Sequence, residues 1–193
     1  MSLVPAFEIG LWNAWIFELY ALLPCPLLTL TPLKKRAPPS PDLSTLNEAE
    51  RRTFGLSRVV MFLPFIYSIF LPLKLGTTWF YIGLPIALVG LVMYTIVWVN
   101  LVSIRPGDGP ATGGLYRFSR HPMYLTGFLM AIGISIACAS WLFLVLSIAS
   151  LFFANVRYAG SEERFLLQKY GDAYREYMDR TPRWIGIPKS GGR

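Results

Sequence analysis

Long stretches without charged side chains alternate with short basic segments along this chain. Residues 75–104 form a thirty-residue stretch without Asp, Glu, Lys or Arg, and residues 121–156 form a second one of thirty-six. Residues 9–33 carry one acidic residue, and residues 59–73 carry no charge. A helix needs about twenty residues to cross the apolar core of a bilayer. The pattern therefore predicts an all-α integral membrane protein.

The longest uncharged stretch is too long for a single span. As one helix it would measure roughly 54 Å at 1.5 Å per residue. We predict a break near Ala139 and Ser140, which makes a hairpin of two short helices, with a shallow re-entrant pair as the alternative. About five transmembrane helices are then predicted, at about 9–33, 55–74, 77–104, 122–138 and 141–160.

Basic residues lie almost entirely on one side of these predicted spans. Segments 34–58, 105–120 and 157–193 hold six, three and eight of the eighteen Lys and Arg residues, and only Lys74 falls on the other side. Basic loops stay in the cytoplasm, so the N-terminus is predicted outside, with a cytoplasmic C-terminal helix. This bias accounts for the net charge of +7 without a nucleic-acid partner.

Composition agrees with a single membrane-embedded domain over residues 1–193. Hydrophobic residues make up 54% of the chain, against about 45–50% in soluble domains. Cys25 and Cys138 both fall in predicted spans, and His121 is the one histidine, so we expect neither a disulfide framework nor a metal site. The compact size favours the plasma membrane of a prokaryote, with the lipid bilayer as the surrounding partner.

Two segments far apart in sequence bring titratable side chains to the same predicted membrane face. Residues 120–124, Arg-His-Pro-Met-Tyr, lie where a polar loop enters an apolar helix, and Glu162 and Glu163 lie where an apolar helix leaves the membrane. Each alone has a structural explanation: proline is tolerated in the first helical turn, and the glutamates have arginine neighbours. Together they predict a site at the lipid–water boundary.

The segments beside this site are a glycine-rich loop and an amphipathic tail. Loop 105–116 has the backbone freedom to approach a ligand closely. Its glycines miss the spacing of a dinucleotide-binding fingerprint, and no strand–turn–helix context surrounds them. The tail 162–177 carries an aromatic stripe interrupted by Gly171. We expect this tail to fold back and close the loop side of the site.

Five short motifs occur in order over residues 108–188. They are Thr-Gly-Gly-Leu-Tyr at 112–116, Arg-His-Pro-Met-Tyr at 120–124, Glu-Glu at 162–163, Tyr-Gly-Asp-Ala-Tyr-Arg-Glu-Tyr at 170–177 and Pro-Arg at 182–183. In order and spacing they resemble the isoprenylcysteine carboxyl methyltransferase and phospholipid methyltransferase superfamily of integral membrane methyltransferases.

The resemblance implies S-adenosylmethionine as methyl donor, bound at the cytoplasmic face by residues from about 105 to 188. It also implies a lipophilic methyl acceptor, which is either an isoprenylcysteine-type carboxylate or a lipid-like substrate. Because adjacent helical residues point about 100° apart, we expect Glu162 to face the cofactor and Glu163 to be structural, paired with Arg or Lys. The implied cofactor contacts are Asp108, Gly109, Pro110, Ala111, Tyr116, His121, Pro122, Met123, Tyr124 and Glu162.

The acceptor half of the site departs from the superfamily pattern. Prenylcysteine enzymes carry an arginine four residues before the first glutamate, where this chain has Tyr158, with Arg157 beside it. Both are candidate substrate-binding residues, and no catalytic residue is assigned. An amine acceptor would need a base to remove its proton, and Glu163 and Tyr158 are the candidates. The alternatives are an NADPH-dependent sterol-reductase-like membrane enzyme and a non-catalytic membrane protein of the same fold.

Overall fold

The structure, a computed structural model, describes residues 8–23, 48–104 and 108–188, without the side chains of most residues in 49–61 and of 153–158. Throughout these ranges the regular secondary structure is helical, as predicted. The described helices are α1 (Trp15–Leu22), α3 (Glu48–Ser68), α4 (Thr78–Ser103), the short 3₁₀ helix η3 (Gly114–Arg117), α5 (Pro122–Ala137), α6 (Trp141–Tyr170) and α7 (Asp172–Arg180).

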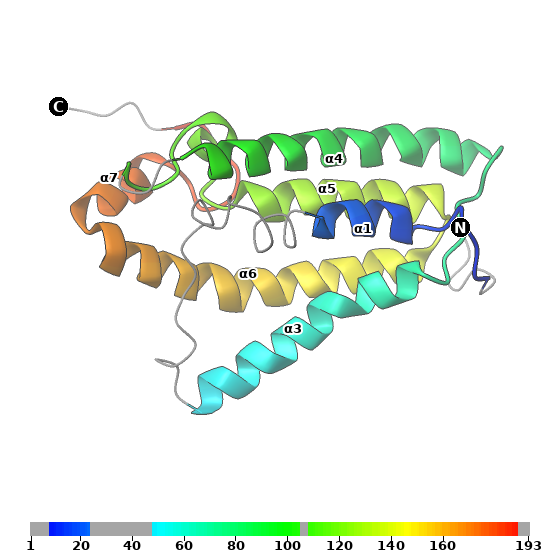
Figure 1. The fold of residues 1–193 in the computed structure, drawn as a ribbon, viewed down its shortest axis with the longest axis horizontal. Helices are drawn as coiled ribbons and strands as arrows, with labels where there is room; N and C mark the ends of the chain where they lie inside the picture. The colour runs from blue at the N-terminus through cyan, green and yellow to red at the C-terminus, as the bar shows by residue number, and fades with distance from the viewer. Residues whose placement is uncertain (1–7, 24–47, 105–107, 189–193) are drawn as a thin grey trace.

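The long helices run lengthwise and connect at two opposite ends of the molecule (Figure 1). Helices α4, α5 and α6 lie alongside one another, and α3 leans obliquely against α6. One end holds the connection from α3 to α4 and the tight turn from α5 to α6. The other end holds η3, α7 and the C-terminal segment. Residues 120–124 and 162–163 therefore reach the same end, as the sequence predicts.

Small residues bring α4 and α5 into backbone contact. An added Cβ at Gly83 would lie 2.2 Å from the amide nitrogen of Ala137, and one at Gly133 would lie 2.1 Å from that of Ala87. These residues follow each other at four-residue spacing, Gly83 to Ala87 on α4 and Gly133 to Ala137 on α5. Such spacing lets helices approach closely in an apolar environment. The pair therefore forms a rigid base for the loop between its two helices.

The predicted break between the last two apolar helices is confirmed. Helix α5 ends at Ala137 and α6 begins at Trp141. Ala139 has a positive φ of 52°, which turns the chain sharply, and Ser140 caps α6 because its hydroxyl accepts a hydrogen bond from Phe143 N at 3.2 Å. The long uncharged stretch is thus divided where its length requires a turn.

The other predicted spans agree with the structure to different degrees. Helix α4 matches the predicted span 77–104, and among the described residues it is the one helix long and apolar enough to cross a membrane. Two apolar helical segments, Pro122–Ala137 and Trp141–Phe152, are shorter. The helical hydrogen bonding of α6 continues past the predicted end at 160, as far as Tyr170.

The boundaries predicted for the first two spans were wrong. Helix α3 begins at Glu48 rather than 55 and ends at Ser68 rather than 74, because residues 69–74 leave the helix and bond to the segment before α1. Ala14 N donates to Leu71 O at 2.9 Å and Leu73 N donates to Trp12 O at 3.0 Å. Helix α1 begins only at Trp15 rather than at 9, and residues 24–33 of that span lie outside the described part.

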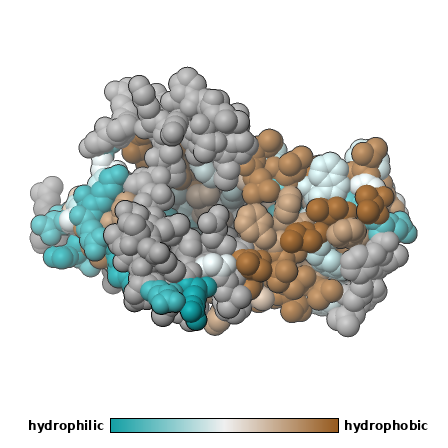
Figure 2. Space-filling view, turned by 60° about the horizontal axis from the view of Figure 1, so that its bottom comes forward, coloured by the Kyte–Doolittle hydropathy of each residue, from teal (hydrophilic) through white to brown (hydrophobic). Residues whose placement is uncertain are grey.

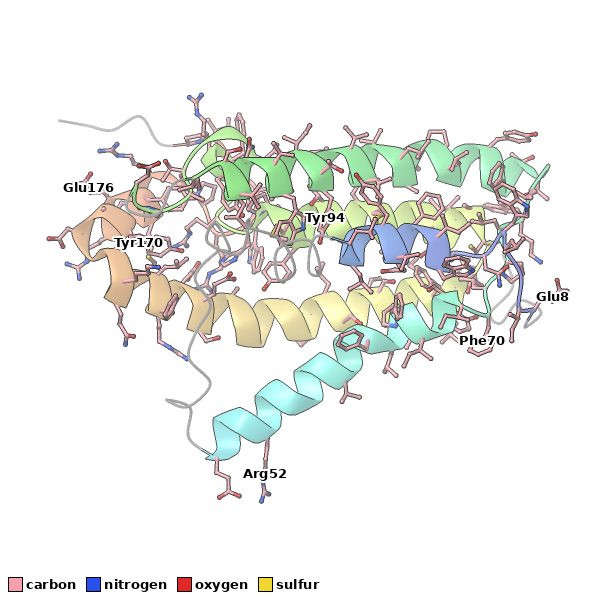
Figure 3. The ribbon with its side chains drawn as sticks, in the orientation of Figure 1. Glu8, Arg52, Phe70, Tyr94, Tyr170 and Glu176 are labelled. Carbon is pink, nitrogen blue, oxygen red and sulfur yellow. The ribbon has the colours of Figure 1, made fainter. Side chains whose placement is uncertain are left out.

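Polarity divides the molecule along its length. Figure 2 shows apolar residues gathered over the part away from α7 and hydrophilic residues concentrated at the α7 end. Figure 3 places Tyr170 and Glu176 at this polar end, opposite Glu8 and Phe70. A surface of this kind fits an apolar body within lipid and a polar end in water, and the sequence-distant charged motifs lie at that polar end.

Candidate functional site

His121 lies at the junction between the loop and α5, directly before the first residue of the helix. Its backbone N–H donates to the Ser119 hydroxyl at 3.0 Å, and Pro122 occupies the first turn, where the missing proline N–H has no helical partner to lose. The Thr126 hydroxyl donates to Pro122 O at 3.0 Å. This arrangement fixes the backbone of His121, and its ring is buried.

Glu163 is the buried hub of the site. Its Oε1 accepts from His121 Nε2 at 3.1 Å and from Arg183 Nε at 3.0 Å. Arg183 Nη2 donates to Oε2, so the guanidinium binds the carboxylate with two hydrogen bonds. Arg120 Nη1 lies 3.4 Å from Oε1, as an ion pair without hydrogen-bond geometry. The sequence-based expectation that Glu163 pairs with a basic residue thus agrees with the structure.

Glu162 approaches the same imidazole from its other nitrogen. Its Oε2 lies 3.6 Å from His121 Nδ1. The Glu162 side chain is 41% exposed, whereas that of Glu163 is 4% exposed. The two carboxylates diverge from α6, yet both reach His121 because its ring lies between them. Glu162 is therefore the carboxylate of the pair that solvent and ligands can reach.

The charges of this cluster change the pKa of its members. Burial lowers the pKa of His121, but hydrogen bonds and charge from Glu162 and Glu163 outweigh it and raise the pKa above its ordinary value. Burial raises the pKa of Glu163, but hydrogen bonds from His121 and Arg183, with charge from Arg120, bring that pKa down to about 2. The two carboxylates thus favour the protonated form of His121, which lies between them.

The C-terminal strap, residues 181–188, closes over the cluster. It is joined to the loop before α5 by three hydrogen bonds: Arg120 N to Pro182 O at 3.1 Å, the Ser119 hydroxyl to Arg183 O at 3.2 Å, and Gly186 N to Phe118 O at 3.2 Å. These bonds bring Arg183 to Glu163 and Trp184 to His121.

Two aromatic rings flank the imidazole. The Trp184 ring centroid lies 5.5 Å from that of His121, and the Tyr124 centroid lies 5.7 Å from it. Sequence reasoning gave no role to Trp184 or to Arg183, although Arg183 belongs to a motif recognised there. The two residues approach the cluster only because the chain reverses at Gly171, where φ is 55°, and returns through α7.

Helix α7 packs on the loop side of the site, as predicted for the tail. Tyr174 and Tyr177 are buried against Tyr116. The Tyr177 hydroxyl donates to Tyr116 O at 2.7 Å, and burial raises the pKa of Tyr177, which keeps the hydroxyl protonated as a donor. Burial and the nearby Glu162 charge also raise the pKa of Tyr116. This cluster fixes the loop that leads into His121.

Most of the residues predicted to contact the cofactor lie together at the polar end. Whether they bind a cofactor stays a prediction. Ala111 and Met123 pack against the Tyr116 cluster. Asp108 is exposed, whereas Gly109 and Pro110 are partly buried before that cluster. For the predicted substrate-binding pair, Arg157 and Tyr158, the structure describes the backbone within α6 but no side chains. The predicted contacts at one end are Ala111, Tyr116, His121, Pro122, Met123, Tyr124 and Glu162.

Part of the chain, including both motifs that meet in this cluster, matches a known family. The family model of phospholipid methyltransferase covers residues 103–173, a range that contains η3, the start of α5 and the Glu162–Glu163 pair. The resemblance to the superfamily of membrane methyltransferases is confirmed by this match. A search of curated proteins found no match to the chain. The matched segment supports a methyltransferase. Arg183 and Trp184, which contact Glu163 and His121, lie outside the matched range.

Proposed function

We propose that the protein is an S-adenosylmethionine-dependent methyltransferase that acts on a lipophilic acceptor at the cytoplasmic face of the membrane. The observation that supports this most is the approach of Glu162 to His121 within the segment matched to phospholipid methyltransferases. The two residues are far apart in sequence, and the fold brings them to the end of the apolar body.

The side chains present fit the functional groups of this cofactor. Glu162 offers a half-exposed carboxylate for the cofactor's ammonium or ribose hydroxyls. Arg120 adds positive charge beside the cluster that favours its carboxylate, while Arg120 Nη1 lies 3.4 Å from Glu163 Oε1. Tyr124 and Trp184 offer ring faces for an adenine.

For methyl transfer, the main requirement on the protein would be to position the two reactants. Bound S-adenosylmethionine would supply an electrophilic methyl group. Holding two reactants in line in a site shielded from water supplies much of the rate enhancement, and the strap covers His121 through Trp184. A carboxylate or thiolate acceptor needs no base. For an amine acceptor, the pKa of about 2 makes Glu163 a poor proton acceptor, so it is not retained as a candidate base.

The proposed setting is a plasma membrane crossed by about five helices, with the site on the cytoplasmic side. Among the described residues, the basic residues of η3, α7, the end of α6 and the strap lie at the site end, whereas Lys74 lies at the opposite end. This distribution supports that orientation. A lipophilic acceptor would then enter sideways from the bilayer, since a lipid tail gains nothing by crossing water. Phospholipid-like and prenylated acceptors both satisfy this requirement.

Ligand-dependent thermal unfolding of the purified protein in detergent tests the proposal. S-adenosylmethionine and its demethylated product should each raise the unfolding temperature, and NADPH should not. At a hundred times the dissociation constant, binding to the folded state alone adds about 2.7 kcal/mol. No shift with either ligand, in protein shown to be folded, would refute the proposal, and a shift with NADPH alone would favour the reductase-like alternative.

The two glutamates provide a matched pair of variants for the same measurement. Glu162→Gln should weaken binding of the demethylated product by about tenfold or more, because a hydrogen bond to a charged group is worth about 1.5–3 kcal/mol. It should leave the unfolding temperature without ligand nearly unchanged, since Glu162 is half exposed. Glu163→Gln should instead lower that temperature. Unchanged binding by Glu162→Gln would contradict the role given to Glu162.

A further inference from the structure

The strap, residues 181–188, has an inner side fixed to the site and an outer side with exposed apolar residues. Ile185 and Ile187 are 78% and 89% exposed. Gly186 between them donates its N–H to Phe118 O at 3.2 Å, and an added Cβ there would lie 2.8 Å from Pro182 Cγ. Two large apolar side chains are therefore exposed on either side of a glycine that is tied to the body of the molecule.

A third apolar side chain extends this surface. Phe118 is 52% exposed, and it is joined to the strap because Gly186 N donates to Phe118 O at 3.2 Å. Phe118 precedes the first residue of α5 by four positions, so it lies where the apolar helix meets the polar loop. The outer strap surface, formed by Phe118, Ile185 and Ile187, is thus at the level of the proposed membrane boundary.

Basic side chains accompany the outer strap surface. Arg117 directly precedes Phe118 and is exposed. Arg180 and Arg183 lie just before and within the strap, and both side chains are partly exposed. Apolar residues with arginines around them are typical of segments that lie in the headgroup region, where anionic lipids attract the positive charge. A protein partner with an acidic rim would be the other occupant of such a surface.

We propose that the outer strap surface inserts into the anionic headgroup layer of the same membrane. This inference rests on the proposed membrane placement of the helices. Ile185 and Ile187 enter the lipid interface, and Arg117 and Arg180 contact anionic headgroups, while Arg183 stays bound to Glu163. Because Arg183 and Trp184 of the same strap touch Glu163 and His121, lipid contact holds the cover of the site in place. The charge of the nearby lipid thereby affects how firmly the site is closed.

Site-specific fluorescence in lipid nanodiscs tests this contact. Ile187→Cys is labelled with bimane and compared in nanodiscs of phosphatidylcholine alone and of phosphatidylcholine with phosphatidylglycerol. Quenching is measured with one lipid that carries a nitroxide near its headgroup and with a second that carries it in the middle of the acyl chain, which reaches the depth of α4. The labelled unsubstituted chain serves as the blank. Val92→Cys, 57% exposed on α4, is the lipid-facing control, and Asp172→Cys, exposed at the start of α7, is the water-facing control.

The label at Ile187 should be quenched severalfold more than the label at Asp172, and more strongly with phosphatidylglycerol than without it. Quenching at Val92 together with an unquenched Ile187 label in both membranes would overturn the inference and leave the membrane placement intact. A blue-shifted but unquenched Ile187 label would indicate a protein partner or a second copy of the chain, and would also overturn it. An unquenched Val92 label would overturn the membrane placement itself.

Discussion

The buried carboxylate of Glu163 contacts three basic side chains, so loss of its negative charge leaves their positive charge without a partner. Glu163→Gln should lower the free energy of unfolding by roughly 3 kcal/mol, because breaking a buried ion pair strands its partners. The partners are His121, Arg183 and Arg120. Thermal or denaturant unfolding in detergent measures the change.

Glu176 offers a matched control on α7. Its side chain is 70% exposed, with Arg180 as an i,i+4 partner at 3.5 Å. Exposed pairs of this kind contribute about 0–1 kcal/mol, so Glu176→Gln should change stability little. Equal losses in the Glu163 and Glu176 variants would contradict the role of Glu163 as the hub of the site.

The pKa shifts of His121 and Glu163 make stability depend on pH in opposite directions. The lowered pKa of Glu163 contributes stability above its ordinary value of 4.5, which is lost as pH falls toward about 2. The raised pKa of His121 contributes stability below its ordinary value of 6.5, which is lost as pH rises through the folded-state pKa. Stability should therefore be highest between these limits.

His121→Gln separates the two effects in unfolding temperatures measured across pH. The variant should lose the decline that the unsubstituted protein shows above neutral pH, because no imidazolium remains to be deprotonated. It should keep the decline in acid that Glu163 causes. An alkaline decline of the same size in both proteins would show that another group is responsible.

Part of the site follows from sequence and part does not. His121 and Glu162 could be expected at one membrane face because each lies at the boundary of an apolar stretch. Arg183 could not be assigned to Glu163, because their contact depends on the length of α6, the reversal at Gly171 and the packing of α7. The motifs identify candidate residues, but the path of the chain through α7 and back to α5 determines which of them come into contact.

Helix boundaries differed in how well the sequence predicted them. The turn at Ala139 and Ser140 was predictable because an uncharged stretch of this length exceeds one span. The end of α3 was not, because residues 69–74 still read as apolar. Their backbone bonds instead with the segment before α1. The close contact of α4 and α5 corresponds to a sequence pattern, the four-residue spacing of Gly83 with Ala87 and of Gly133 with Ala137. The positions of the uncharged stretches do not depend on this pattern.

The contact of Gly133 on α5 with Ala87 on α4 can be tested by a single substitution. Gly133→Ala should destabilise the protein by at least about 1–3 kcal/mol, the usual cost of overpacking, because the new methyl would lie 2.1 Å from Ala87 N. Gly127→Ala on the same helix meets no atom within 4 Å. That change should be neutral or stabilising, since alanine favours helix by about 1 kcal/mol over glycine. Similar unfolding temperatures for the two variants would contradict the observed α4–α5 packing.

The whole molecule combines an apolar body with one polar end that carries the charged site. The apolar surface and the polar end are separated along the long axis (Figure 2), and the helix connections place the loop, α7 and the strap at that end (Figure 1). An acceptor held in the bilayer and a cofactor dissolved in water can meet only where these two regions join. The position of His121 and Glu162 at the polar end is what relates the fold to the proposed methyl transfer.

Transfer of radiolabelled methyl from S-adenosylmethionine to lipid is the measurement that tests the proposed function. The purified protein is incubated in vesicles made from total lipid extracts, and label is counted in the organic phase. Label should appear in a lipid-soluble product with the unsubstituted protein, and the rate should be at least about tenfold slower with Glu162→Gln at equal folded protein. Absence of lipid-soluble label from folded protein that binds the cofactor, across prenylated and phospholipid acceptors, would contradict the proposed function.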